Sequence, residues 1–267
     1  MGWRSTVGDA WDGLWGLAIR NLLFPEFCAL CNIRLLTEDN HHFCPTCWES
    51  SPRIERPFCS VCGRPHPRGV GMMGRHNFPC GACAAQLPKL PYRRVVGAAH
   101  YAGAVEEAVK RFKFHGKLNL TEPLAALLEE TVTAELDPDA YDWLVPVPLH
   151  RVRQRERGYN QALVLAEALM PVFSNARIDQ CLRRIRPTHT QSRIKDPAER
   201  RRNVRGAFAI EGASHLKGGA VLLLDDVITT HGTVEECARI LRQVGVAHVD
   251  VLAIALATSP HEKPPPA

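Results

Sequence analysis

The sequence predicts an α/β protein in which a parallel sheet flanked by helices follows a small cysteine-rich domain that binds zinc. Residues 220–224 are apolar without a break, which is typical of a strand buried on both faces of a parallel sheet. Residues 234–244 then place apolar side chains at a helical period. Eight of the ten cysteines form four Cys-x-x-Cys pairs in the first third of the chain, a pattern typical of metal binding.

Composition limits the class of protein. The 267 residues allow one large domain or two smaller ones, and 45% apolar and 23% charged residues are ordinary for a globular chain. No apolar run approaches the roughly 18 residues of a membrane span. Asp9 and Asp12 interrupt any signal-peptide pattern. Because paired cysteines in an unsecreted chain indicate metal rather than disulfides, we expect a reducing, cytoplasmic location and no transmembrane segment.

Residues 1–27 form the first expected element, an amphipathic helix with bulky aromatic side chains on one face. Its apolar positions recur every three or four residues and comprise Trp3, Val7, Trp11, Leu14, Trp15, Ala18 and Leu22. Two roles fit such a face. It packs on the rest of the protein, or it docks on a partner or a membrane surface.

Residues 28–91 form a cysteine-rich domain and its linker. Two thiolates one turn apart can hold one ion, and tetrahedral zinc needs four thiolates, so each ion takes two pairs. We expect one or two structural zinc ions, since sulfur can fill every position of the metal. The expected ligands are Cys28, Cys31, Cys44, Cys47, Cys59, Cys62, Cys80 and Cys83.

The spacing of the cysteine pairs leaves their combination open. Twelve residues separate the first two pairs and seventeen the last two, so sequential and interleaved pairing both fit a ribbon. Four histidines nearby could each replace a cysteine, although we expect surface positions for them: His41, His42, His66 and His76.

Residues 92–258 form the expected α/β domain, and residues 259–267 a disordered tail. Apolar runs and periodicity predict strands at 95–101, 142–149, 208–210, 220–224 and 247–256, and helices at 103–112, 123–134, 162–170 and 234–244. Alternating strands and helices of this kind are typical of a parallel sheet.

Basic residues concentrate in the middle of this domain. Residues 151–205 contain fourteen Arg and Lys against five Asp and Glu, although the net charge of the chain is only +5. Such a segment favours a polyanionic ligand, namely a diphosphate, a nucleotide or a nucleic acid; a solvated surface is the alternative.

Two smaller basic groups are candidate anion sites. Pro148, Arg151 and Arg157 follow a buried strand and open a helix, where guanidinium groups bind diphosphate well. Lys113 lies in residues 110–117, where basic and aromatic residues interleave. That segment stacks on a ligand or binds phosphate, or it is simply a helix end with cations near its C-terminus.

The stretch after residue 224 combines an acidic pair, a hydroxyl-rich turn and a helix. Asp225 and Asp226 repel each other, so we expect them at a solvated strand end that faces a polyol, a metal or a cation. The turn opens a helix, where backbone amides and the helix dipole bind phosphate. Its residues are Thr229, Thr230, His231, Gly232 and Thr233.

This stretch resembles the phosphoribosyl-pyrophosphate (PRPP) signature of type I phosphoribosyltransferases. The resemblance implies that Asp225 and Asp226 hold the ribose hydroxyls and that residues 229–233 cradle the 5-phosphate. His231 departs from the pattern, because the family usually has glycine there. If the backbone needs a positive φ, histidine is strained, so either the loop is reshaped or His231 itself touches phosphate.

The order of motifs across residues 24–257 resembles the ComF family of competence-associated, phosphoribosyltransferase-like proteins. After the cysteine pairs and the basic segment near Lys113 come Val-Pro-Val-Pro-Leu, Arg-Gly-Tyr-Asn-Gln, Arg-x-Asn-Val-x-Gly-x-Phe and Asp-Asp-Val-x-Thr-Thr. The resemblance implies a phosphoribosyltransferase-like fold, binding of PRPP with Mg²⁺, and a part in handling incoming DNA. Residues 145–151 would form the diphosphate loop, and residues 188–205 would lie in or near a flexible hood.

Three functions fit these features. The first is phosphoribosyl transfer to or from a base or amine in nucleoside or nucleotide metabolism, with no general base evident in the sequence. The second is a sensor of PRPP or a nucleotide, whose zinc ribbon and basic segment bind single-stranded DNA or a competence protein. The third is a zinc-stabilised nucleic-acid-binding protein with a vestigial phosphate loop.

Overall fold

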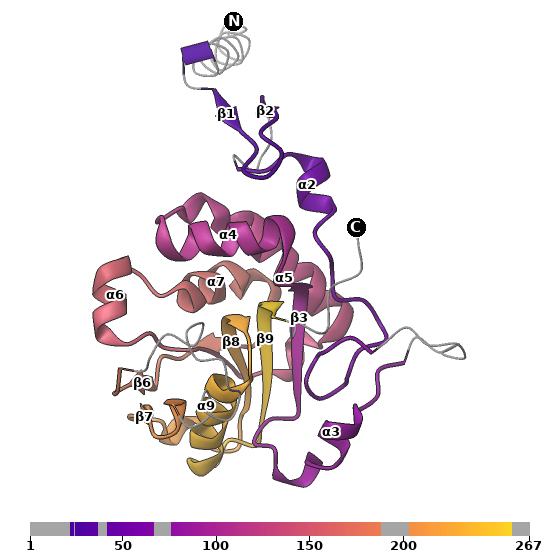
Figure 1. Ribbon diagram of the computed structural model, residues 1–267. Coiled ribbons are helices and arrows are strands. Elements are labelled where there is room, and N and C mark those ends of the chain that lie inside the picture. The colour runs from indigo at the N-terminus through magenta and orange to yellow at the C-terminus, as the bar shows by residue number, and fades with distance from the viewer. Residues whose placement is uncertain (1–21, 24, 37–41, 67–75, 188–202, 258–267) are drawn as a thin grey trace, which may run out of the picture.

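The computed structural model describes residues 22–23, 25–36, 42–66, 76–187 and 203–257 (Figure 1). Most of the expected N-terminal helix, most of the expected hood and the expected tail lie outside these ranges. Residues 26–27, at the end of the expected helix, belong to a short strand instead. No described helix is both long and apolar enough to cross a membrane.

A five-stranded parallel sheet forms the centre of the molecule. Its spatial order is β3 (Arg94–His100), β9 (His248–Leu256), β8 (Ala220–Ile228), β4 (Trp143–Pro146) and β5 (Arg177–Ile178). Each neighbouring pair is parallel. The expected parallel sheet with flanking helices is therefore confirmed. Residues 208–210 form a strand as predicted, but that strand, β7 (Phe208–Ile210), pairs with β6 (Leu182–Arg184) in a separate antiparallel hairpin.

Helices cover both faces of the sheet and divide the core in two. One face packs against α4 (Gly103–Phe114), α5 (Thr121–Glu135) and α7 (Gln161–Leu169), and the other against α9 (Gly232–Gln243). Strand β8 contributes alternately: Leu222 and Leu224 face the first set, and Val221 and Leu223 face α9. Alternation with burial on both sides explains why the strand reads as an unbroken apolar run.

The cysteine-rich residues form two small ribbons that contact different parts of the sheet domain. The first contains β1 (Glu26–Phe27), β2 (Arg34–Leu35) and α2 (Pro45–Glu49), and it lies against α4 (Figure 1). The second leads into α3 (Gly81–Ala84), and its buried residues join the core on the α9 face. The described residues also contain short 3₁₀ turns: η1 (Leu87–Lys89), η2 (Leu118–Leu120), η3 (Pro138–Ala140), η4 (Met170–Val172) and η6 (Ser214–Leu216).

Residues 52–61, which lead from the first ribbon into the second, cover the outer edge of β3. The Ile54 amide donates to the Ala98 carbonyl over 3.1 Å, and the His100 amide donates to the Pro52 carbonyl over 2.9 Å. The Val95 amide donates to the Val61 carbonyl over 2.8 Å. Backbone groups at a sheet edge that would otherwise face water are thereby paired.

A buried carboxylate joins β3 to β9 at the amino end of the sheet. Asp250 is fully buried and accepts hydrogen bonds from Arg93 over 2.7 Å and 2.9 Å, and from the Tyr141 hydroxyl over 2.8 Å. Burial opposes its ionisation, but these hydrogen bonds outweigh burial and lower the pKa of Asp250. Arg94 completes the network with a 2.9 Å contact.

Tyr141→Phe removes one donor to this carboxylate without changing the shape of the core. We expect the free energy of unfolding at pH 7 to fall by about 1.5–3 kcal/mol, because the lost hydrogen bond is to a charged group. Urea denaturation with zinc held constant measures the effect. Since the folded-state pKa of Asp250 is depressed, the contribution is present at neutral pH and is lost as the pH falls below about 4. Ser174→Ala, which removes an exposed hydrogen bond to Asp139, is the control. Equal effects of the two substitutions would contradict the prediction.

Candidate functional site

Strand β8 carries the acidic pair into the carboxyl end of the sheet. The sequence predicts that the strand ends on Asp225 and Asp226, but β8 continues to Ile228, and Asp225 and Val227 pair with Ala253 and Ala255 of β9. Strand alternation therefore turns the two carboxylates to opposite faces of the sheet. The pair lies within the strand rather than at its end.

Asp226 lies on the face covered by α4. The residue is 9% exposed, and its carboxylate lies 2.7 Å from the ammonium of Lys113, in the last turn of that helix. A largely buried ion pair of this kind is screened less by salt than a surface pair. The structure thus brings together two residues that the sequence treats as separate candidates.

Asp225 lies on the opposite face, toward α9. Burial and the nearby charge of Asp226 raise the pKa of Asp225 to about 7, although the charges of Lys113 and Arg184 act in the other direction. A carboxyl group with this pKa exchanges protons near neutral pH. A ligand that donates hydroxyl groups or carries positive charge would favour its ionised form.

The Thr-rich loop, residues 229–233, connects β8 to α9. His231 is the N-cap of α9 and has φ 62°, the left-handed conformation that favours glycine. Its imidazole Nε2 donates a 2.9 Å hydrogen bond to the backbone carbonyl of Cys62 in the second ribbon. The backbone at residue 231 therefore does have the positive φ that strains a histidine.

A cleft of about 720 Å³ opens at the same end of the sheet, and the charged residues in its lining are mostly cations. Lys113 and Arg157, both expected from the sequence, line it together with Arg153 and Arg184. Glu156 is the acidic residue in its lining. A concave surface with this balance of charge suits a phosphorylated ligand.

Arg157 is held in the cleft from two sides. Its guanidinium lies 5.0 Å from the centre of the Phe114 ring and donates a 2.8 Å hydrogen bond to Gln161. Gly158 has φ 82° and ends α6 (Arg151–Arg157) directly after it. The Arg-Gly-Tyr-Asn-Gln motif therefore orients a guanidinium group by fixing the helix end beside it.

The rest of that motif fastens neighbouring elements. Asn160 caps α7 through the Ala162 amide and donates to the Val147 carbonyl, each over 3.1 Å. The Tyr159 hydroxyl donates to the carbonyl of Phe112 in α4. These bonds connect the turn after β4 to the helix that carries Lys113.

The other expected residues are placed differently. Arg151 is exposed at the start of α6, and Pro148 is half-buried between β4 and α6. Gly232 lines a second hollow, of about 330 Å³, beside the first turn of α9. Thr229, Thr230 and Thr233 are half-buried.

Two cleft residues are not singled out by the motifs. Arg153 lies four residues before Arg157, and that helical spacing is a signal that could have found it. Arg184 lies in β6, where its guanidinium is 5.3 Å from the Phe208 ring. The pairing of β6 with β7 brings Arg184 to the cleft, so no local sequence pattern predicts its position there.

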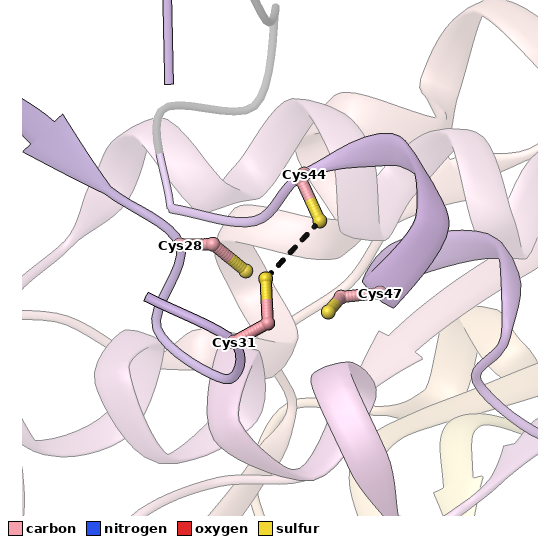
Figure 2. A group of neighbouring side chains, drawn as sticks. All are labelled: Cys28, Cys31, Cys44 and Cys47. Atoms are coloured by element: carbon pink, nitrogen blue, oxygen red, sulfur yellow. Dashed lines mark hydrogen bonds between the residues drawn. The ribbon is translucent and has the colours of Figure 1, made fainter. Parts of the chain in front are cut away.

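The eight cysteines form two groups of four in sequential order. The first cluster is Cys28, Cys31, Cys44 and Cys47, and the second cluster is Cys59, Cys62, Cys80 and Cys83. Within each cluster the sulfur atoms lie within 4.8 Å of one another. Figure 2 shows the four side chains of the first cluster converging, with the Sγ atoms of Cys31 and Cys44 3.6 Å apart. The interleaved alternative is therefore wrong.

Both clusters fit a structural zinc ion. Burial disfavours thiolates, but backbone amides directed at sulfur outweigh it and lower the pKa of Cys28 to about 6 and that of Cys59 to about 7. Four convergent sulfurs leave no open position, which is typical of a structural site.

The described histidines lie outside the two groups of ligands. The ring of His42 contacts the side chain of Asn119 over 3.2 Å, and His66 stacks on Phe78. His76 is exposed, and His41 lies outside the described residues.

Comparison with known proteins identifies relatives along most of the chain. The family model of the double zinc ribbon domain matches residues 19–84. Competence protein F of Haemophilus influenzae is 32% identical over 75% of this chain and 85% of its own length. The DNA utilization protein YhgH of Salmonella typhi is 31% identical over 86% of this chain and 96% of its own. Competence protein ComFC of Bacillus subtilis is 27% identical over 79% and 82%.

Solved structures with a similar arrangement include two enzymes of purine chemistry. One is described as the allosteric regulatory enzyme of purine biosynthesis, at 17% identity and a TM-score of 0.34, covering 54% of this chain and 30% of its own. The other is a purine phosphoribosyltransferase from Pyrococcus horikoshii, at 17% identity and a TM-score of 0.30, covering 51% and 71%.

Asp225→Asn tests the perturbed carboxyl group. Because the folded-state pKa of Asp225 is raised to about 7, its contribution to stability is full in acid and is lost as the pH rises through 7. The asparagine variant has no charge to bury, so its stability relative to wild type should increase by roughly 1–2 kcal/mol between pH 5 and pH 8. Urea denaturation at both pH values measures this. Asp139→Asn changes an exposed carboxylate, so the stability of this control relative to wild type should be the same at both pH values. The same pH independence for Asp225→Asn would refute the prediction.

Proposed function

This chain belongs to the family of competence protein F and DNA utilization protein YhgH, and we propose that it binds PRPP or a related phosphorylated ribose at the carboxyl end of its sheet. The names of its relatives support a part for this binding in the handling of DNA taken up from outside. Mg²⁺ would accompany the diphosphate, because this ion is commonly held between one or two carboxylates and the phosphates of a substrate.

One observation carries the proposal. A single strand–loop–helix unit presents the acidic pair and the first turn of α9. A cleft whose lining includes four cations opens at the same carboxyl end of the sheet. Carboxylates accept hydrogen bonds from sugar hydroxyls, helix amides bind a monophosphate, and guanidinium groups bind a diphosphate. Each of the three chemical parts of PRPP would thus find a group suited to it.

Each group has a distinct task in this arrangement. Asp226 would read the ribose hydroxyls from the face that carries Lys113, and the Thr-rich loop would hold the 5-phosphate, whereas Asp225 points to the opposite face of the sheet. Lys113, Arg153 and Arg157 would face the diphosphate. In the absence of ligand, Lys113 pairs with Asp226. Ligand binding would replace this ion pair with two contacts, one from the Lys113 ammonium to a phosphate and one from the Asp226 carboxylate to a ribose hydroxyl.

The same geometry supports phosphoribosyl transfer as well as sensing. In transfer, the bond from C1 to the diphosphate breaks, and the departing oxygens gain negative charge that guanidinium groups and Mg²⁺ would stabilise. Release of diphosphate in the presence of a panel of bases and amines distinguishes the two forms, because a sensor releases none.

Asp226→Asn should abolish or strongly weaken PRPP binding. The substitution removes a charged acceptor from the ribose, so we expect the affinity measured by isothermal titration calorimetry with Mg²⁺ to fall by about 10-fold or more.

The control for this measurement is Asp139→Asn, an exposed carboxylate in η3, before the amino end of β4. It should bind PRPP as wild type does. Absence of binding heat for the wild-type protein, with both zinc sites filled, would overturn the proposal and favour the form with a vestigial loop.

A specific feature favours single-stranded DNA as a second ligand of the same cleft. The ring of Phe114 is 65% exposed at the cleft rim, next to the guanidinium of Arg157. Bases stack on exposed aromatic rings while cations follow the phosphate backbone. An accessory, non-catalytic role in DNA uptake would use this surface.

Phe114→Ala tests this second role. We expect it to weaken binding of a fluorescent oligothymidine about 5-fold or more, because stacking contributes roughly 1–3 kcal/mol per base. Phe114→Tyr keeps a ring and should bind as wild type does. The logarithm of the affinity should fall linearly with the logarithm of salt concentration, with a slope that reflects several phosphates. Equal binding by the alanine and tyrosine variants would exclude stacking on this ring.

A further inference from the structure

The hydrogen bond between His231 and Cys62 joins the Thr-rich loop to the second ribbon across 169 residues of sequence. We propose that the second cluster holds the Thr-rich loop in its shape through the imidazole of His231. His231 is then a positioning residue, and the loop's conformation depends on the metal site. The consequence for ligand binding rests on the proposed function, whereas the mechanical link does not.

The backbone of His231 needs support from outside the loop. With φ 62°, a residue bearing a Cβ atom is less stable than glycine by about 1 kcal/mol. Such conformations persist where surrounding contacts determine them. The 2.9 Å bond from Nε2 to the Cys62 carbonyl is a contact of this kind, and glycine could not make it.

The acceptor of that bond is itself firmly placed. The Cys62 amide donates to the Cys59 sulfur over 3.4 Å, and the Gly63 amide donates to the Cys59 carbonyl over 2.9 Å. Gly63 packs so closely on β3 that an added Cβ would lie 2.7 Å from the Val95 carbonyl oxygen. One side of this turn is thus fixed by the sheet.

The other side of the turn is fixed by the second cluster. Cys62 supplies a sulfur atom to the cluster and a carbonyl oxygen to His231, so one residue serves both contacts. A zinc ion bound by the four sulfurs would hold the Cys59–Cys62 turn closed, and with it the backbone that carries the Cys62 carbonyl. Without the ion, only the hydrogen bonds of the turn would hold it, so the acceptor of the imidazole would gain freedom to move.

Movement of His231 changes the first turn of α9. Its own carbonyl accepts the first hydrogen bond of the helix, from the Glu235 amide over 2.8 Å. The amides of the following residues, which would receive the phosphate, take their direction from this turn. Because coupling between two sites is reciprocal, a ligand on the loop should also slow zinc loss from the second cluster.

Hydrogen exchange tests the mechanical link without any ligand. In the His231→Asn variant, asparagine tolerates the left-handed backbone, but its side chain is too short to reach the Cys62 carbonyl. In zinc-loaded protein, we therefore expect the hydrogen-exchange rate of amides 229–235 to rise about 3–10-fold, which corresponds to the loss of one hydrogen bond. His231→Gln retains a donor on a longer side chain and should restore much of the protection. Equal exchange in wild type and His231→Asn would overturn the inference.

Removing single thiolates identifies the cluster responsible. Cys83→Ser in the second cluster should raise exchange in the Thr-rich loop, and the matched change Cys31→Ser in the first cluster should not. In the His231→Asn background, Cys83→Ser should add little, since the link is already absent. The same rise from both cysteine variants would contradict a specific link. If Cys83→Ser fails to fold, the His231 variants still decide the matter.

PRPP with Mg²⁺ separates this inference from the proposed function. Zinc release to a chromogenic chelator should slow on adding PRPP in the wild type and in Cys31→Ser, which retains only the second cluster. The slowing should be absent in His231→Asn. Failure of PRPP to bind refutes the proposed function but leaves the exchange result intact. Binding of PRPP with equal slowing in wild type and His231→Asn refutes the link.

Discussion

The ion pair between Lys113 and Asp226 is the contact on which the arrangement of the site depends. Neighbouring carboxylates on one strand repel each other, and the repulsion grows as water is removed. The ammonium, 2.7 Å from Asp226, offsets this repulsion only if the last turn of α4 reaches the carboxyl end of β8. Complete burial of Phe112 and the hydrogen bond from Tyr159 to its carbonyl keep that turn in place. The electrostatics of the site are therefore a result of helix packing.

The two ribbons support the two faces of the sheet domain separately. The first cluster has Cys28 and Cys44 buried in the same core as α4, and His42 contacts Asn119 beyond that helix. The second cluster has Cys59 and Cys62 buried with α9 and β3. Each group of four cysteines thus lies beside the helix that presents one half of the candidate site, Lys113 on one side and the Thr-rich loop on the other.

Patterns confined to one segment were predictable from the sequence, and pairings between segments were not. The apolar run of β8, the helices and the cysteine pairs follow from local periodicity and spacing. Sequential and interleaved pairing of the cysteines could not be distinguished from the sequence, because both fit the spacing of a ribbon. The extension of β8 through Asp225 is due to β9, whose backbone pairs with a residue that favours loops. Arg184 reaches the cleft only through the β6–β7 hairpin.

The position of β9 has a consequence for the order in which the chain can fold. Strand β9 follows the other four strands of the sheet in the chain, yet it lies between β3 and β8. The sheet therefore stays in two parts until β9 has been synthesised. Residues 52–61, which precede β3, are available from the beginning to pair with its outer edge. A nascent chain can thus shield one side of β3 while the other side waits for its partner.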